Sequence, residues 1–406
     1  MSEQSARRRL ILLAPIGPAP GGNGLAMRCE LFRRAAARDF EVQTVVVPVA
    51  GPAGASGAVE VANDGERSRE GLRSLLAAPQ WRERLARAGS LPQAARAASP
   101  GLAGTVVQAL GARRFDALHV MRAYLAPLGV ALADHLGVEA RTLDLDDDDV
   151  AVLGAHRNRA EAAAYERLID VFGGLYDGQC AASALDASAI AARHELAVEH
   201  VPNAVALPAG TPSPAPRAAE LRLLFVGNLT YPPNVEAARL LVGDVLPRLR
   251  AMLGERPLRV TLAGSAHPDV ERLASPNVRV LGFVDDLDPL YADADVVLVP
   301  LQSGGGTRIK LLEAFAQGVP VVATPAAAQG LAVEDRRHLL LAADPQGLAT
   351  AVAALAADPG LARLLVEQSG RLVRERYSHD AVIPLVRAFL SGATRAPRSP
   401  QPSVSS

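Results

Sequence analysis

The chain of 406 residues contains 49% hydrophobic and 21% charged residues, and its formal net charge is −1. This length and apolar content allow substantial hydrophobic cores and favour two domains or one large one. The balanced charge excludes a global field that would attract nucleic acid or an anionic membrane, so any basic site has to be local.

The amino-terminal segment and the cysteines indicate the compartment. Residues 7–14 are similar to the basic and apolar regions of a signal peptide, but prolines interrupt them before residue 21. The most apolar inner stretch, residues 117–133, contains a histidine, an arginine and a proline and therefore fails as a membrane span. Cys29 and Cys180 lie far apart without metal-ligand spacing, which argues against a disulfide framework and a zinc site. We expect a cytoplasmic protein.

Short apolar runs bounded by glycine or proline alternate with Ala- and Leu-rich helical stretches along the chain. This pattern is typical of parallel sheets covered by helices. The predicted strands of the first half are residues 10–14, 42–47, 116–120, 140–145 and 200–201. Those of the second half are residues 221–226, 259–263, 278–281, 296–299, 319–323 and 339–341. Two series of strands predict an α/β protein with two sheets.

A proline-rich stretch separates the two series of strands. Its prolines prevent both helix and central strand, so it marks a linker. The expected parts are an amino-terminal domain 1–207, a linker 208–218, a carboxy-terminal domain 219–375, a helix 376–391 that packs back toward the amino-terminal domain, and a disordered tail 392–406.

Three charged or polar stretches of the first half each permit two interpretations. Trp81 begins a run with several arginines, for which a solvated helix is preferred to a binding patch. His119 stands at a strand end, where a functional histidine and a core histidine bonded to the backbone are both open. Residues 144–149 hold five aspartates, for which we prefer a solvated or acceptor-facing acidic loop to a metal site.

The segment 304–315 combines three glycines, two cations and one carboxylate at the start of a predicted helix. Glycines let the backbone approach an anion, and the free N–H groups and dipole of a helix start favour negative charge. Arg308 and Lys310 add full charges. If Thr307 caps the helix, Glu313 lies about 9 Å from the start, where a ribose would follow a pyrophosphate at the glycines. The alternative is an ordinary strand-to-helix connection with a solvated charged face.

Five stretches, in this order, carry a resemblance that spans nearly the whole chain. They are Gly21-Gly22-Asn23-Gly24 with Arg28, residues 116–120, residues 201–205, residues 225–229 continued by 231–234, and the glycine block running through Glu313 to residue 322. Together these stretches resemble the family 4 glycosyltransferases, retaining enzymes of the GT-B fold that use nucleotide-sugar donors. Residues 281–284 also match the family segment that recognises the base of the nucleotide. The resemblance implies two Rossmann-like doubly wound domains facing across a cleft, and no metal or other cofactor.

The chain departs from the family pattern at three places. Gly305 stands where the family has the first acid of its Glu-x7-Glu motif, while Glu313 keeps the second acid. Met121 replaces the second histidine of a His-x-His motif. Thr230, Tyr231 and two prolines replace the basic residues that often hold the diphosphate, so Arg308 and Lys310 are expected to carry that charge. A glycine-rich motif ending in Thr-Arg-x-Lys-x-x-Glu is similar to one branch of the family.

The resemblance implies roles for individual residues. The candidate catalytic residues are Arg308, Lys310 and His119. The candidate donor-binding residues are Gly227, Asn228, Phe283, Val284, Gly304, Gly305, Gly306, Thr307 and Glu313, the last accepting hydrogen bonds from the ribose. Gly21, Gly22, Asn23 and Gly24 are expected on the acceptor or leaving-phosphate side, approaching from the opposite domain, with a plain turn as the alternative. Helices similar to the one at Trp81 dock peripheral family members onto membranes, so peripheral contact with the inner membrane face stays open.

The leading hypothesis is a retaining glycosyltransferase that moves a sugar from a nucleotide-diphosphate donor to a glycan, lipid-linked or small-molecule acceptor. Gly305 and Met121 motivate an alternative, a degenerate GT-B protein that binds a nucleotide sugar without chemistry. A second alternative is an epimerase that acts on the nucleotide sugar itself.

Overall fold

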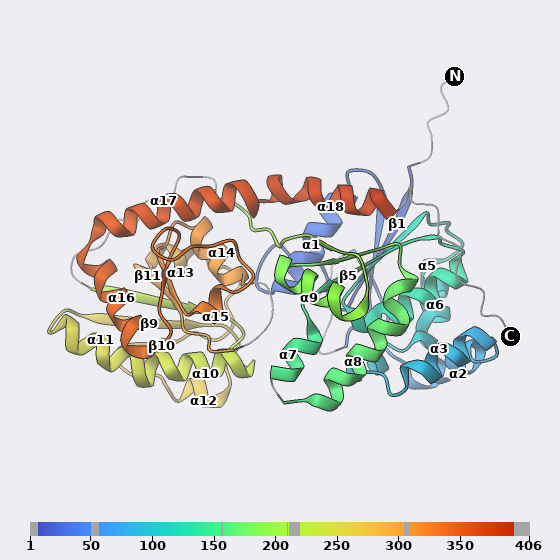
Figure 1. The fold of residues 1–406 in the computed structure, drawn as a ribbon, viewed down its shortest axis with the longest axis horizontal. Helices are drawn as coiled ribbons and strands as arrows, with labels where there is room; N and C mark the ends of the chain where they lie inside the picture. The colour runs from blue at the N-terminus through green and yellow to red at the C-terminus, as the bar shows by residue number, and fades with distance from the viewer. Residues whose placement is uncertain are drawn as a thin grey trace, which may run out of the picture. The chain divides into compact units, whose positions relative to one another are not determined.

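The structure of the chain is a computed structural model that describes residues 7–49, 57–155, 157–208, 210, 220–303 and 308–393 (Figure 1). The chain divides into two compact units, each with its own parallel sheet. The first unit comprises Met1–Ala19, Arg28–Pro202 and Ile383–Ser406, and the second comprises Pro20–Met27 and Asn203–Val382.

In the described residues, the sheet of the first unit has seven parallel strands in the order β3-β2-β1-β4-β5-β6-β7. They are β1 (Arg9–Ala14), β2 (Glu41–Val46), β3 (Val59–Glu60), β4 (Ala117–Met121), β5 (Ala140–Asp146), β6 (Gly178–Ala181) and β7 (Val198–His200). After its first residue β1 is buried throughout, as its unbroken apolar run requires in a sheet covered on both faces. The strand order reverses between β1 and β4, and the carboxyl ends of strands at such a point are where ligands bind in open α/β sheets.

The helices of the first unit are mostly amphipathic, and some of them begin at a polar side-chain cap. They are α1 (Gly24–Ala36), α2 (Gly65–Leu75), α3 (Pro79–Ala88), α4 (Gln93–Ala97), α5 (Ala103–Leu110), α6 (Ala126–Leu136), α7 (Asp149–Ala155), α8 (Arg159–Phe172) and α9 (Ala184–His194), with short 3-10 turns at Pro100–Leu102, Ala123–Leu125 and Gly173–Leu175. Asp64 caps α2 and Ser183 caps α9 through their side-chain oxygens. Residues 126–133 of α6 are all apolar and buried in the core of this unit, whereas its last turn is exposed and contains Asp134 and His135.

The described residues of the second unit form a six-stranded parallel sheet in the order β10-β9-β8-β11-β12-β13. Its strands are β8 (Leu221–Val226), β9 (Leu258–Ala263), β10 (Val278–Val280), β11 (Val296–Val299), β12 (Val321–Ala323) and β13 (Leu340–Leu341). The strand order reverses between β8 and β11. The connections that follow these two strands carry the residues of the candidate site.

Helices cover the second sheet (Figure 1). They are α10 (Pro232–Leu240), a π-helical turn η4 (Leu241–Val245), α11 (Leu246–Leu253), α12 (Pro268–Glu271), α13 (Asp288–Asp293), α14 (Ile309–Ala316), α15 (Pro325–Ala328), α16 (Pro345–Ala357) and α17 (Pro359–Arg376), and α18 (His379–Ala393) ends the described chain. α11 packs against α16, and α14 packs against α17. α17 thus supports α14, and the first turn of α14 follows the connection from the carboxyl end of β11.

The α/β class with two parallel sheets is confirmed, and the predicted strands are found with shifts of one or two residues at their ends. β3 and β6 were not predicted. Pro20–Met27 groups with the second unit, whereas the sequence had placed it with the first. Most of the predicted linker and of the predicted tail lies outside the described residues, and α18 extends to Ala393.

Among the described helices, none is by itself long and apolar enough to cross a bilayer. α16 and α17 meet this criterion only as a pair, and their axes bend by 103° at the junction.

Candidate functional site

The candidate site lies at the start of α14, after β11. Residues 304–307, which include the predicted phosphate-binding glycines and Thr307, lie outside the described residues. α14 begins at Ile309 with Arg308 as its N-cap, one residue later than a Thr307 cap would require. Lys310 and Glu313, both of which were predicted site residues, therefore stand on the first two turns of the helix.

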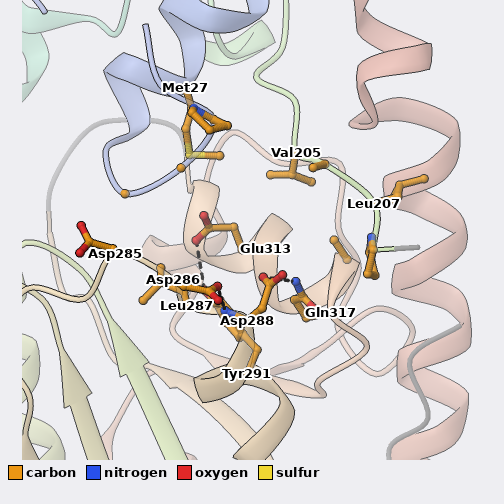
Figure 2. A pocket seen from close by; sticks show the side chains of 16 residues that line it. Met27, Val205, Leu207, Asp285, Asp286, Leu287, Asp288, Tyr291, Glu313 and Gln317 are labelled. Carbon is orange, nitrogen blue, oxygen red and sulfur yellow. Dashed lines mark hydrogen bonds between the residues drawn. The ribbon is translucent and has the colours of Figure 1, made fainter. Parts of the chain in front are cut away.

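Two pockets of the second unit share Glu313. The first, here called the Lys310 pocket, has a volume of about 360 Å³. The predicted site residues that line it are Gly22, Asn23, Gly24, Gly227, Asn228, Lys310 and Glu313. The second, the Glu313 pocket, has a volume of about 450 Å³ and is lined by the aspartates of the α13 entry, by Tyr291 and by residues 205–208 (Figure 2). Gly21 and Gly22 line this second pocket.

Lys310 brings a positive charge into the Lys310 pocket. Its Nζ donates a hydrogen bond of 2.8 Å to Asn234 Oδ1 and lies 4.8 Å from the centre of the Phe225 ring. Burial, with a smaller contribution from Arg308, lowers the pKa of Lys310 from 10.5 to about 7, while Glu313 opposes the shift. The ammonium is thus held in a place where an additional anion would stabilise it.

Glu313 lies between the two pockets. The Tyr291 hydroxyl donates a hydrogen bond of 3.1 Å to Glu313 Oε2, drawn as a dashed line in Figure 2. Burial raises the pKa of Glu313 to about 7, although the Tyr291 bond and Lys310 act in the opposite direction. A ligand hydroxyl that donates to this carboxylate would stabilise its charged form.

Gly227 is required by the close packing at the carboxyl end of β8. A Cβ atom at this position would lie 2.8 Å from Lys310 Nζ and 3.1 Å from Asn234 Nδ2. Any side chain at residue 227 would therefore displace the ammonium or the amide. Asn228, the next residue, accepts a hydrogen bond of 2.8 Å from Asn234 Nδ2 through its backbone oxygen.

The glycine turn after β1 combines the two roles that the sequence left open. Asn23 Oδ1 accepts hydrogen bonds from the N–H groups of Leu25 and Ala26 and so caps the start of α1, while Gly22 has a φ of +82°. The same turn lines both pockets, and a Cβ on Gly24 would lie 3.0 Å from Ile309 Cδ1. Pro20–Met27 groups with the second unit, and the expected role of this turn on the acceptor or leaving-phosphate side stays a prediction.

Arg308, Phe283 and Val284 are near the site but do not line either pocket. Arg308 is only 7% exposed, and its Nη2 donates 3.0 Å to the backbone oxygen of Ala326 in α15. Phe283 is 62% exposed. The later residues of its loop, from Asp285 onward, reach the Glu313 pocket instead.

His119 lies deep in the core of the first unit, with no exposed surface. Its ring stacks on Phe32 at 4.4 Å, and its Nδ1 lies 2.8 Å from Thr142 Oγ1. Burial lowers its pKa to about 3, so the ring is neutral. These features match the core alternative, with a threonine hydroxyl as the partner in place of a backbone group.

The aspartate run is a largely buried ion-pair network and not a solvated loop, while the acceptor-facing alternative stays a prediction. Arg28 and Asp144 have no exposed side-chain surface and are joined by bonds of 2.6 and 2.8 Å. Arg122 contacts Asp146, Asp147 and Asp149, and Arg193 contacts Asp148. Arginines compensate the carboxylates, and the described residues contain no cluster of His, Cys, Asp and Glu suited to a metal ion.

Trp81 does not form part of an exposed patch. Its side chain is buried, its ring lies 6.0 Å from that of Phe172, and the Arg84 guanidinium lies 5.4 Å from the ring centre. The arginines of α3 therefore lie on a surface without an exposed aromatic from this position.

Sequence reasoning missed two residues of the site, Asn234 and Tyr291. The signal for Asn234 was present, because a Pro-Pro-Asn sequence stands where the resemblance led us to expect basic residues after Gly227. Tyr291 lies on α13, and nothing in its local sequence indicates a partner on α14.

Comparisons with known proteins agree with this geometry. Residues 220–358, which include the start of α14, match the family model "Glycosyl transferases group 1". A curated relative, the UDP-N-acetylglucosamine–N-acetylmuramyl-(pentapeptide) pyrophosphoryl-undecaprenol N-acetylglucosamine transferase of Burkholderia lata, is 32% identical over 202 residues, which is 46% of this chain and 45% of the relative. The chain thus matches less than half the length of that relative.

Two solved structures are similar over almost the whole chain. Sucrose-phosphate synthase from Thermosynechococcus elongatus has a TM-score of 0.65 at 18% identity, with 93% of this chain and 97% of that chain covered. The Anabaena protein HepE in complex with UDP and glucose has a TM-score of 0.65 at 17% identity, with coverage of 94% and 99%. The chain therefore has the GT-B fold of two parallel-sheet α/β domains, and its residues 220–358 match the group 1 glycosyl transferase model.

Proposed function

We propose that the protein is a retaining glycosyltransferase that takes a sugar from a nucleotide-diphosphate donor. The observation that carries this proposal is that Lys310 and Glu313, which belong to successive turns of α14 in the matched region, line one pocket. A cation and a carboxylate at this spacing suit the diphosphate and the ribose of one ligand. The complex of HepE with UDP and glucose supports a uridine donor as the first to test.

The proposed roles follow from the charge that develops during transfer. Negative charge grows on the leaving diphosphate, so preorganised cations and N–H groups lower the barrier. Lys310 takes the diphosphate together with the amides of residues 304–307, and Arg308 adds positive potential from the N-cap of α14. Glu313 accepts from the ribose hydroxyls. Because these groups supply the compensating charge, we expect no metal requirement.

The acceptor is proposed as a glycan, a lipid-linked sugar or a small molecule. We place the reaction in the cytoplasm, because the two cysteines, Cys29 and Cys180, are both free thiols buried in the first unit. His119 has a structural role in this proposal, because its ring is enclosed in the core.

The test is transfer from labelled UDP- and GDP-sugars to a panel of acceptors, with product anomers assigned by NMR. We expect turnover with retained configuration in the wild type and none in Lys310→Ala or Glu313→Ala. Unchanged turnover in both variants would rule out the proposed donor site at Lys310 and Glu313. Donor binding without turnover favours the binding-protein alternative, and a changed donor sugar without acceptor identifies an epimerase.

A further inference from the structure

Lys310 is the only lysine in the sequence, and all other basic residues counted among its 42 lysines and arginines are arginines. The packing around the ammonium explains why an arginine does not fit here. Gly227 and Asn234 approach so closely that even a Cβ on Gly227 would lie 2.8 Å from Nζ. A compact ammonium fits this space, whereas a planar guanidinium is larger and carries its donors in a fixed fork.

The partner of Lys310 is neutral. In the described part of the chain, no carboxylate lies within ion-pair distance of Nζ, and the hydrogen bond goes to the amide oxygen of Asn234. Most buried charges in proteins are paired with an opposite charge. The amide gives this partly buried ammonium no ion-pair partner, so the charge that Lys310 carries when protonated remains available to a ligand.

Asn234 is itself held in place. It is 8% exposed, and its Nδ2 donates 2.8 Å to the backbone oxygen of Asn228. The orientation of the amide is unambiguous, because a carbonyl can only accept and an ammonium can only donate. Asn234 lies in the first turn of α10, where its N–H bonds to the oxygen of the N-cap residue Tyr231 at 2.9 Å.

We propose that Asn234 is a positioning residue that holds the Lys310 ammonium in the pocket without neutralising it, so that the charge meets the donor diphosphate. This inference rests on the proposed donor site. An aspartate at residue 234 would form an ion pair with Lys310 and compete with the ligand. A leucine would leave the ammonium without this acceptor.

The arrangement links ligand binding to proton uptake. The charged groups that face Lys310 are Arg308 and Glu313 on α14, while α10 contributes Asn234 and β8 contributes the Phe225 ring, both neutral. Since its pKa is lowered to about 7, Lys310 is largely neutral at pH 8 in the free protein. A bound diphosphate raises this pKa, so binding at pH 8 takes up a proton.

The experiment measures UDP binding by titration calorimetry at pH 8 in two buffers of different ionisation enthalpy, which gives affinity and proton uptake together. The variants are Asn234→Asp and Asn234→Leu, with Asn277→Asp as a matched control that lines neither pocket. The free-state pKa of Lys310 is read directly by NMR from the side-chain Cε signal in protein labelled with ¹³C-lysine, because the chain has one lysine.

We expect both variants at residue 234 to bind UDP about tenfold more weakly, because Asn234→Leu removes the hydrogen bond to the ammonium and Asn234→Asp holds the ammonium in an ion pair that competes with the diphosphate. Their effects on the Lys310 pKa should be opposite: aspartate raises it and abolishes proton uptake at pH 8, whereas leucine lowers it further. The control should match the wild type. A merely structural role for Asn234 would change the melting temperature without this opposite pair of pKa shifts.

Two results would count against the inference in different ways. If the wild type binds UDP and Asn234→Asp binds equally well with the same proton uptake, the positioning role is wrong and the proposed donor site stands. If the wild type binds none of UDP, GDP, ADP, CDP and dTDP, the donor site fails and this inference fails with it. Should Asn234→Asp not fold, Asn234→Leu still decides, and an unchanged UDP affinity in that variant would overturn the positioning role.

Discussion

The two units each place charged side chains near the carboxyl ends of parallel strands. In one unit the charge has an oppositely charged partner, and in the other its partner is neutral. In the first unit, Arg28 and Asp144 neutralise each other and expose no surface. In the second unit, Lys310 lies in a pocket beside a neutral amide. The difference shows that a charge indicates a ligand site only when its partner inside the protein is missing or neutral. Substitutions of either residue in these pairs test this difference between the two units.

The largest expected effect is on stability in the first unit. Arg28→Met leaves the Asp144 carboxylate buried and unpaired, which should lower the free energy of unfolding by about 3–5 kcal/mol. Urea denaturation measures the loss. The double variant Arg28→Met with Asp144→Leu should recover most of it, because no uncompensated charge then remains, and an additive loss in the double variant would contradict this account.

Lys310→Ala should weaken ligand binding without lowering stability, which is the reverse of the effect expected for Arg28→Met. We expect UDP affinity to fall by about 1.5–3 kcal/mol, a roughly tenfold to hundredfold loss, because a charged hydrogen bond to the diphosphate is removed. The melting temperature should stay the same or rise, since a buried ammonium with a lowered pKa is a cost to the folded state. Calorimetry measures the affinity for UDP, and a thermal melt of the same sample measures the stability. A fall in stability without loss of UDP affinity would mean that Lys310 has a structural role, as Arg28 does.

Glu313→Gln should weaken UDP binding by roughly tenfold and reduce the preference for UDP over 2′-deoxy-UDP. The carboxylate accepts charge-assisted hydrogen bonds from the ribose hydroxyls, which a neutral amide makes less strongly. Competition between the two nucleotides measures the preference. Glu334→Gln serves as the matched control, because Glu334 is exposed and lines neither pocket. An unchanged preference in Glu313→Gln would rule out the contact between Glu313 and the ribose.

The smallest effect is the pH dependence of UDP affinity. Both Lys310 and Glu313 have a pKa of about 7 in the free protein, from opposite directions. Above pH 7 the lysine has to gain a proton, and below pH 7 the carboxyl has to lose one, so affinity should peak near pH 7 and fall by at most about tenfold per pH unit on each side. Titrations from pH 5.5 to 9 measure the profile. A flat alkaline side would mean that Lys310 is charged throughout and is not held as described.

The strands were predictable because buried parallel strands are continuous apolar runs. β6 was missed because its sequence Gly-Gln-Cys-Ala lacks that pattern, and Gln179 is satisfied only by backbone oxygens of Gly173 and Tyr176 that local sequence does not reveal. β3 has two residues and gives no periodicity. Local pattern therefore identified the sheets and missed the strands whose burial depends on distant partners.

Within the candidate site, Lys310 and Glu313 were predictable because their spacing on one helix is a local property. The state of the aspartate run was not, since Arg28 lies 116 residues from Asp144. The same holds for Asn234, which is 76 residues from Lys310. One sequence shows which groups carry charge, and only the fold shows which of those charges are already paired.

The most direct measurement of the central claim uses the single lysine. Lys310 is acetylated with a limiting amine reagent, and its modification rate is followed by mass spectrometry with and without saturating UDP, with the N-terminal amine as internal reference. The account predicts that UDP slows the modification of Lys310 at least about tenfold, because the bound diphosphate covers the amine and raises its pKa, so that less of the reactive neutral form is present. An equal rate in protein shown to be saturated with UDP would contradict it.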